Sequence, residues 1–409
     1  TATPEIYTLS LHDALPIWLL SAIPIPGVDA IKLQNFISNN QFVGVLNVFS
    51  GGGLSTLSII MLGVGPYITS SIIMQLLTIM SPKLKAMYQE DEEIGRKKFT
   101  QFSRMLTIPL AIVQGVALLV LLQRQGIMTD VTMFGMITNV SVVVAGSMLI
   151  MWIGELVSEF GIGNGVSLII FAGIVASIPK EVSQFFFTFD VASLPVYILF
   201  LIVGLLIVAG VVIVTEAERP VPVTYAKQVR GDHVSGGTQT YLPIRVNQAG
   251  VIPIIFALSI LLFPQLIGNA LAGMTNGTLL AISKGLLWFV QNTWLYSLFY
   301  FIFVFVFTYF YTAVTFDPEQ ISTNLQKNGA FVPGVRPGAA TRDYISRILN
   351  RTTMMGAVFL GLIAVLPLII RAITGISAFA IGGTALLIVV SVVLDLIKKT
   401  DAQLSMREY

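Results

Sequence analysis

The sequence contains no cysteine and very little charge. Only 11% of its 409 residues are Asp, Glu, Lys or Arg, whereas soluble globular domains carry roughly 25%. Disulfides, thiol nucleophiles and cysteine-ligated metals are excluded because all of them need cysteine. The charge deficit leaves too few polar side chains to cover a water-facing surface. The chain is therefore expected to lie in a lipid bilayer.

Histidine is almost as scarce, and the common sequence signatures of catalysis are missing. The only histidines are His12 and His233, and neither belongs to a His-Glu-x-x-His zinc motif. The sequence also has no Gly-x-Ser-x-Gly nucleophile elbow and no P-loop. The glycine-rich string Gly161–Gly165 lacks the spacing of a dinucleotide-binding loop, and we interpret it as a turn between helices. We expect no active site, no metal and no cofactor.

Long apolar runs are abundant, and 55% of the residues are hydrophobic. A helix needs about 20 apolar residues to cross a hydrocarbon core of about 30 Å. These runs do not alternate as barrel strands do, so helices are predicted. A first span is incomplete, because its apolar run Ile17–Ile23 ends at Pro24. Nine further spans are predicted at Ile59–Met80, Phe102–Leu122, Met133–Val157, Val166–Ile178, Leu194–Thr215, Val251–Ile267, Trp294–Val314, Thr353–Ile373 and Ile376–Ile397.

The basic residues predict the orientation. If every span crosses once, 18 of the 23 lysines and arginines fall on one side, which is cytoplasmic by the positive-inside rule. These are Lys83, Lys85, Arg96, Lys97, Lys98, Arg104, Arg219, Lys227, Arg230, Arg245, Lys327, Arg336, Arg342, Arg347, Arg351, Lys398, Lys399 and Arg407. The remaining five fall outside: Lys32, Arg124, Lys180, Lys284 and Arg371.

Two cytoplasmic connections, 216–248 and 316–352, are much longer than the others. Both mix basic residues with proline and glycine, and each carries too little apolar sequence for a separate core. Basic segments beside a membrane contact either anionic lipid headgroups or a partner. Composition does not decide between the two.

The segment Asn47–Ser55 contains three consecutive glycines and cannot form a stable spanning helix. Irregular backbone is tolerated at membrane depth only where protein or a water-filled cavity surrounds it. Composition alone favours an ordinary external loop. The alternative is a half-helix inside the bundle.

An ion-coupled carrier is the main alternative to a channel, and an intramembrane enzyme is a third. Carriers bury ionisable residues near the midplane of the bilayer. Glu155, Arg371 and Asp395 all lie near the ends of predicted spans, where long side chains reach the interface. A conduit lined by apolar and small polar residues fits better, and no buried ionisable residue stands out as catalytic.

An aromatic group at the outer end of one predicted span is interpreted as an interfacial belt. Tyrosine and tryptophan favour this level because one end of the ring system is apolar and the other is polar. The residues are Trp288, Trp294, Tyr296 and Tyr300.

Four strings give the chain a strong resemblance to a known family. They are Gly65-Pro66-Tyr67-Ile68, Gly161-Ile162-Gly163-Asn164-Gly165, Asn247-Gln248-Ala249-Gly250-Val251-Ile252-Pro253 and Gly329-Ala330-Phe331-Val332-Pro333-Gly334-Val335-Arg336-Pro337-Gly338. From about Ile23 onward, over roughly 380 of the 409 residues, the chain resembles the SecY family. Members of this family are the central subunit of the bacterial protein-conducting channel.

The resemblance implies an all-α polytopic protein of the bacterial cytoplasmic membrane. Its fold is a ten-span clamshell of two inverted five-helix halves around an hourglass pore, here with the first span incomplete. We interpret 1–16 as an atypical segment and a sequence artefact. The other parts are the N-terminal half 17–178, an external loop and sixth span 179–215, a cytoplasmic loop 216–248, spans 249–315, a second cytoplasmic loop 316–352, spans 353–397 and a cytoplasmic tail 398–409.

The resemblance also assigns roles to residues that would otherwise be ordinary span or loop positions. An apolar pore ring maps onto Val64, Ile68, Ile170, Ile255 and Ile388. The plug, a short helix that fills the external funnel, maps onto Asn47, Phe49, Ser50, Gly51, Gly52, Gly53 and Leu54. The lateral gate between the second and seventh spans would include Tyr67, Gln75 and Ser259. Ordinary hydrogen bonds between neighbouring helices are the alternative reading of the gate positions.

The resemblance finally implies partners. The two cytoplasmic loops would receive the ribosome or the motor ATPase SecA, through Arg336, Lys227 and Arg230. SecE and SecG would be companion subunits, signal-sequence-bearing preproteins the substrates, and YidC and SecDF further candidate partners. Membrane lipids surround the chain, and no direct DNA binding is expected.

Overall fold

The computed structural model describes most of the chain with several gaps. The described residues are 18–26, 32–33, 47, 50, 52–54, 56–81, 83–84, 87, 92–128, 132–161, 163–187, 194–226, 228–230, 233–235, 239–272, 276–374 and 378–408. The atypical segment 1–16 lies outside these residues.

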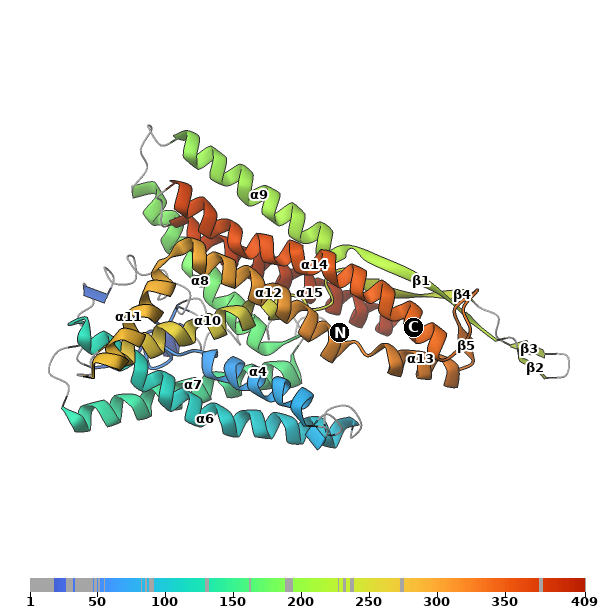
Figure 1. The fold of residues 1–409 in the computed structure, drawn as a ribbon, viewed down its shortest axis with the longest axis horizontal. Helices are drawn as coiled ribbons and strands as arrows, with labels where there is room; N and C mark the ends of the chain where they lie inside the picture. Colours follow the sequence, from blue (N-terminus) through green and yellow to red (C-terminus); the bar gives the residue numbers. More distant parts are fainter. Residues whose placement is uncertain are drawn as a thin grey trace.

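The described residues form a bundle of long helices (Figure 1). Each of the nine predicted spans coincides with one helix, and five of these helices, α6, α7, α10, α12 and α14, meet the length and hydropathy of a membrane span over most of their length. The bounds are α4 (Gly65–Met80), α6 (Glu92–Arg124), α7 (Met133–Phe160), α8 (Gly165–Phe187), α9 (Leu194–Glu216), α10 (Ile252–Leu271), α12 (Thr293–Thr315), α14 (Ala339–Thr374) and α15 (Ala378–Glu408).

Three predicted helix starts were wrong. Helix α6 begins at Glu92 rather than at Phe102. Helix α4 begins at Gly65 rather than at Ile59, because Gly63 adopts a positive φ of 53° and the residues before it form turns. Helix α14 begins at Ala339 rather than at Thr353, so its first turns extend into the cytoplasm. Apolarity marks only the part of a helix that lies in lipid, and it therefore misses polar extensions.

Two further helices were not predicted. Helix α11 (Gly277–Gln291) lies at the end of the bundle opposite the strands, and α13 (Pro318–Lys327) lies beside the strands (Figure 1). Both begin after a side-chain cap, since Asn276 accepts from the amide of Thr278 and Asp317 accepts from the amide of Glu319. Such caps satisfy backbone donors that a helix start leaves unpaired.

The bundle has two halves that touch along two lines. The first half contains α4 and α6–α8, and the second contains α9–α15. Across the two halves, α10 contacts both α4 and α6, while α15 contacts α8. In Figure 1, α4, α6 and α7 lie along the lower side of the bundle and α9, α12 and α14 along the upper side. The seam of α10 against α4 and α6 is called the front seam below.

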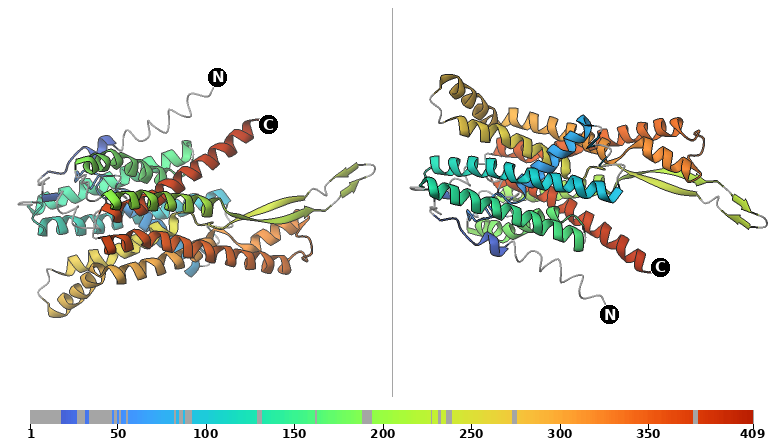
Figure 2. Two further views of the ribbon diagram at one scale, coloured as in Figure 1. Left: turned by 90° about the horizontal axis from the view of Figure 1, so that it is seen from above. Right: turned by 90° about the horizontal axis from the view of Figure 1, so that it is seen from below.

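A β-hairpin projects in all views from the end of the bundle that is predicted to be cytoplasmic (Figures 1 and 2). Strand β1 (Glu218–Tyr225) pairs antiparallel with β4 (Gln239–Arg245) and on its other edge with β5 (Ala330–Phe331). Strands β2 (Gln228–Arg230) and β3 (His233–Ser235) pair at the hairpin tip. The two long cytoplasmic loops are therefore joined in one sheet.

Neither loop was expected to form a separate core, and the structure shows that the two loops share one with α14. Val221 and Ile244 from the hairpin pack with Val332 beside β5 and with Ile345 and Leu349 of α14, and all five are buried. Each loop alone has too few apolar residues to form a core, but the two loops and the start of α14 together supply enough. We call this unit the cytoplasmic module.

The aromatic belt was only partly correct. Trp288 and Trp294 are well exposed, as interfacial residues should be. Tyr300 is only 1% exposed and belongs to the main core, where Tyr296 packs against the same cluster. The four aromatic residues are divided between helices α11 and α12, and the two tyrosines lie on the face of α12 that packs against the core.

Candidate functional site

All five residues of the predicted pore ring are buried members of the main hydrophobic core of the bundle. Val64 and Ile68 come from the start of α4, Ile170 from α8, Ile255 from α10 and Ile388 from α15. Each is at most 7% exposed. Two of the helices belong to each half, so the cluster lies where the halves meet. Aliphatic side chains in this arrangement leave no polar group for water or ions to bind.

The cluster is wider than the predicted ring. Ile60, Ile72 and Ile174 are buried in it as well. Ile72 and Ile174 lie one helical turn after Ile68 and Ile170, so they extend the same helix faces. Ile60 lies in the turns before α4, and no periodic pattern could have indicated it.

The glycine-rich segment is packed inside the first half. Phe49 and Gly51 lie outside the described residues. Of the positions described, Asn47 is helical, whereas Ser50 and Gly52–Leu54 form turns: the amide of Gly52 donates to the Asn47 carbonyl (2.9 Å), and the amide of Leu54 to the Ser50 hydroxyl (3.0 Å). Ser50 and Leu54 are buried. An ordinary external loop would expose these residues.

Helix α7 packs closely against the residues that connect this segment to the pore cluster. Gly146 lies so close to the backbone of Ile59 that a Cβ atom there would overlap the Ile59 carbonyl oxygen. The adjacent Ser147 donates its buried hydroxyl to the carbonyl of Gly63 (2.8 Å). We call Gly146 and Ser147 the α7 seat. It fixes the turns that lead into Val64, the first residue of the pore cluster.

We expect Gly146→Ala to destabilise the protein, because the added Cβ must push the turns around Ile59 off α7. Overpacking of this kind costs about 1–3 kcal/mol. The measurement is the thermal unfolding midpoint of the purified protein, followed by tryptophan fluorescence. Gly115→Ala on α6 is the matched control, since its Cβ would meet Leu62 Cδ1 at 3.6 Å and Val143 Cγ1 at 3.9 Å, both ordinary van der Waals contacts. If both variants unfold at the same temperature, α7 does not hold this segment.

The predicted gate residues make no hydrogen bond across the front seam in the part of the chain described. Ser259 donates its hydroxyl to the carbonyl of Ile255 on its own helix (2.9 Å). The buried Oε1 of Gln75 has no partner. Tyr67 is hydrogen-bonded to Ser71 and interacts electrostatically with Arg104 of α6 and Glu155 of α7. The seam also contains α6, which was not predicted.

The described interior holds no buried charged side chain. All of its buried polar residues are Ser, Thr, Asn or Gln. Glu155, one of three ionisable residues near predicted span ends, accepts a hydrogen bond from Arg104 Nε at 2.7 Å. Asp395 pairs with Lys399 one turn further along α15. These pairs neutralise the carboxylates near the cytoplasmic ends of their helices, where a carrier's midplane site would not lie.

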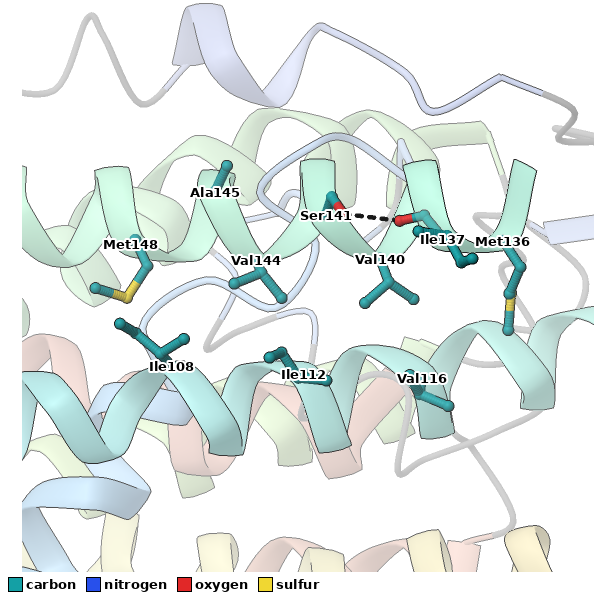
Figure 3. Close-up of a pocket in the computed structure, with 10 residues that line it drawn as sticks. All are labelled: Ile108, Ile112, Val116, Met136, Ile137, Val140, Ser141, Val144, Ala145 and Met148. Carbon is teal, nitrogen blue, oxygen red and sulfur yellow. Dashed lines mark hydrogen bonds between the residues drawn. The ribbon is translucent and has the colours of Figure 1, made fainter. Parts of the chain in front are cut away.

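An apolar groove between α6 and α7 is distinct from the pore cluster (Figure 3). Its volume is about 540 Å³, and of its ten lining residues only Ser141 is polar. That hydroxyl is already donated to the carbonyl of Ile137 (2.8 Å). Ile112 and Ile137 are about half exposed, at 44% and 57%. The groove therefore opens on the outer, lipid-facing side of the bundle.

The predicted docking residues belong to the cytoplasmic module. Arg336 is exposed in the connection from β5 to α14, and its carbonyl accepts the Thr341 hydroxyl (2.8 Å). Arg230 pairs through its backbone with His233 at the tip of the hairpin. Lys227 lies outside the described residues. The structure thus places Arg336 and Arg230 on one projecting unit, although not side by side.

Comparison with known proteins agrees with the fold. A family model described as SecY matches residues 58–397. Protein translocase subunit SecY of Streptomyces scabiei is 40% identical over 403 residues, which covers 95% of this chain and 91% of that protein. The subunit of Synechocystis sp. is 39% identical over 403 residues, with 95% and 89% covered.

Solved structures show the same arrangement of helices. A protein-conducting channel matches with a TM-score of 0.67 at 20% identity and covers 96% of this chain and 90% of that one. A SecY whose plug domain stabilises the closed state of the channel matches with a TM-score of 0.64 at 22% identity, over 96% and 90%. Sec61 from a canine ribosome-channel complex matches with a TM-score of 0.59 at 19% identity, over 96% and 90%.

The family match and the curated relatives identify the chain as part of a protein-conducting channel of the cell membrane, and the solved structures share its fold. It transports protein and is not an enzyme. This chain belongs to the SecY family, the channel subunit of the Sec translocase.

Proposed function

We propose that unfolded preproteins cross the membrane through the centre of this bundle, and that the aliphatic cluster around Ile68 and Ile255 is the constriction they pass. The observation that carries the proposal is the common burial, in one hydrophobic cluster, of Val64, Ile68, Ile170, Ile255 and Ile388 from four helices of both halves. An aliphatic ring blocks ions by dewetting. It also yields to a passing chain, because it offers no hydrogen bonds that the chain would have to break.

The turns around Ser50 and Leu54 act as the plug of the resting channel. They are buried, and they lead through the α7 seat directly into the pore cluster. A solved SecY with the same fold has a plug domain that stabilises its closed state and maintains a membrane seal. We infer that translocation displaces these turns while the α7 seat guides their return.

Apolar segments leave sideways through the front seam. Helix α10 contributes Ile255 to the pore cluster and contacts α4 and α6, so its movement would open the pore toward lipid. Ser259 and Gln75 form no bond that holds the seam shut in this state. The seam is closed mainly by apolar packing, which lipid or a signal sequence can replace at little cost.

The cytoplasmic module receives the partner that drives transport, either the motor ATPase SecA or the ribosome. Arg336 and Arg230 lie on this projecting unit. Related channels of the same fold occur in ribosome complexes, such as canine Sec61. SecE and SecG complete the membrane complex, and YidC and SecDF are further candidates.

The proposal is tested by reconstituting the chain with SecE in lipid vesicles and adding SecA, ATP and a preprotein. We expect the preprotein to become protected from external protease only when ATP is present. A carrier would instead show uptake of a small solute and no protected preprotein. Absence of protected preprotein, with SecE bound and SecA active in solution, contradicts the proposal.

A further inference from the structure

Arg124 joins the two halves at the outer end of the front seam. It is the last residue of α6 in the first half, and its Nη1 donates to the carbonyl of Asn269 at 2.7 Å. Asn269 belongs to the last turn of α10 in the second half. The two residues are 145 positions apart in the sequence. The contact therefore depends on how the halves are placed relative to each other.

The position suits a cation because two helices end there. The last four carbonyls of a helix have no partner within it, and the helix dipole makes this end negative. The end of α6 already has one donor, since Lys32 Nζ reaches the carbonyl of Gly126 at 3.3 Å. In α10, the carbonyl of Gly268 accepts the Ser283 hydroxyl at 2.7 Å. The next carbonyl, that of Asn269, is taken by Arg124.

Below this bond the seam is apolar. Leu262 and Leu266 of α10 pack against the cluster to which α6 contributes Leu118 and Leu122. Leu262, Leu266 and Asn269 are spaced i, i+4 and i+7, so they lie on one face of α10. This face meets the first half through leucines along its length and through one charged hydrogen bond at its outer end.

We propose that Arg124 is a positioning residue of the channel, a clasp that holds the outer end of α10 against α6 and sets how readily the front seam opens. The inference rests on the proposed function of that seam as a lateral gate. When α10 moves away, lipid can replace the apolar contacts of the leucines. The hydrogen bond between Arg124 and the carbonyl of Asn269 is lost without replacement. Loss of the clasp shifts the seam toward the open state.

The test measures the width of the seam directly. Because the chain has no cysteine, cysteines introduced at the exposed positions Gln123 and Ile267 carry the only two spin labels. Pulsed electron resonance on the complex in lipid then gives the distance between α6 and α10. We expect Arg124→Gln to increase the population at longer distance about threefold to tenfold, the effect of losing one hydrogen bond of ordinary strength, because this bond is exposed to solvent. Arg124→Lys keeps a donor and should restore much of the short distance.

Two controls separate the clasp from general effects. Asn269→Ala removes a side chain but keeps the backbone carbonyl, so its distances should match the wild type. Lys284→Gln removes one positive charge at the same end of the bundle, from α11, and should also leave the distances unchanged. Unaltered distances in Arg124→Gln, or equal changes in Lys284→Gln, would overturn the clasp.

A transport assay distinguishes failure of the clasp from failure of the proposed function. A seam that opens more readily should accept a preprotein whose signal sequence has a shortened apolar core, with severalfold more protected product in Arg124→Gln than in the wild type. If the wild type transports a normal preprotein but Arg124→Gln changes neither distance nor signal requirement, only the clasp is wrong. If the wild type transports nothing, the proposed function is wrong.

Discussion

Replacing Arg336 by glutamate is expected to abolish SecA-driven translocation while the chain still inserts into the membrane. Arg336 is exposed, and the connection that carries it is fixed at both ends. Val332 is buried in the cytoplasmic module, and the Thr341 hydroxyl holds the Arg336 carbonyl. The substitution therefore leaves the fold unchanged and acts on binding. Losing one partner of an interfacial charge pair costs about 2–5 kcal/mol, which is about 30-fold to several thousand-fold in the binding constant.

The measurement is protease protection of a preprotein in vesicles that contain equal amounts of each variant. Arg342→Glu is the matched control, because it makes the same change of charge on the same module. Arg342 is exposed and pairs with Asp343 at 2.9 Å, which raises the pKa of its guanidinium. We expect Arg342→Glu to retain most of the activity. Normal protection with Arg336→Glu would show that no partner depends on this residue.

The second large effect is expected at the pore cluster. Ile68→Asn combined with Ile255→Asn should make the resting channel leak ions, with a conductance at least about tenfold above the wild type. Both side chains are buried among aliphatic residues from α4, α8, α10 and α15. An amide binds water where the native side chains exclude it, so a constriction sealed by dewetting becomes wet. Conductance of the purified complex in planar bilayers is the measurement.

The control for the leak places the same two substitutions on the lipid-facing groove. Ile112→Asn with Ile137→Asn introduces equal polarity, but at about half-exposed positions between α6 and α7. We expect no increase in conductance from this pair. If both pairs leak equally, polarity has damaged the bundle in general. If neither pair leaks, the cluster around Ile68 is not the ion barrier.

The membrane helices were predictable because lipid imposes a simple rule on sequence. A span must be apolar over about 20 residues, and this alone located nine helices to within a few residues at their lipid-embedded parts. The pore residues were different. Nothing in the sequence separates Ile170 or Ile388 from other isoleucines, so only the family resemblance could select them. The structure then placed all five in the same buried core.

What the sequence could not show depends on contacts between distant segments. The charge distribution placed Arg124 outside, but no pattern indicated that its side chain bonds to α10. The cytoplasmic module was missed because Val221 and Ile345 lie in different loops, and neither loop has a core of its own. The turns from Ile59 to Gly63 were assigned to a helix since they are apolar, whereas the α7 seat holds them in turns.

Helix α14 is a continuous connection along which force can pass from one end of the molecule to the other. It runs for 36 residues without a break from the cytoplasmic module to the far side of the bundle, about 54 Å at 1.5 Å per residue. Ile345 and Leu349 fasten its first turns to the module, and Gly361 lets its middle pack tightly on Phe301 of α12. The proline inside it, Pro367, lies near the outer end, so the stretch between module and bundle has no proline joint at which to bend. A motor that pushes on the module would therefore move α14 as one rigid helix. The movement would reach the part of α14 that packs in the wall of the channel.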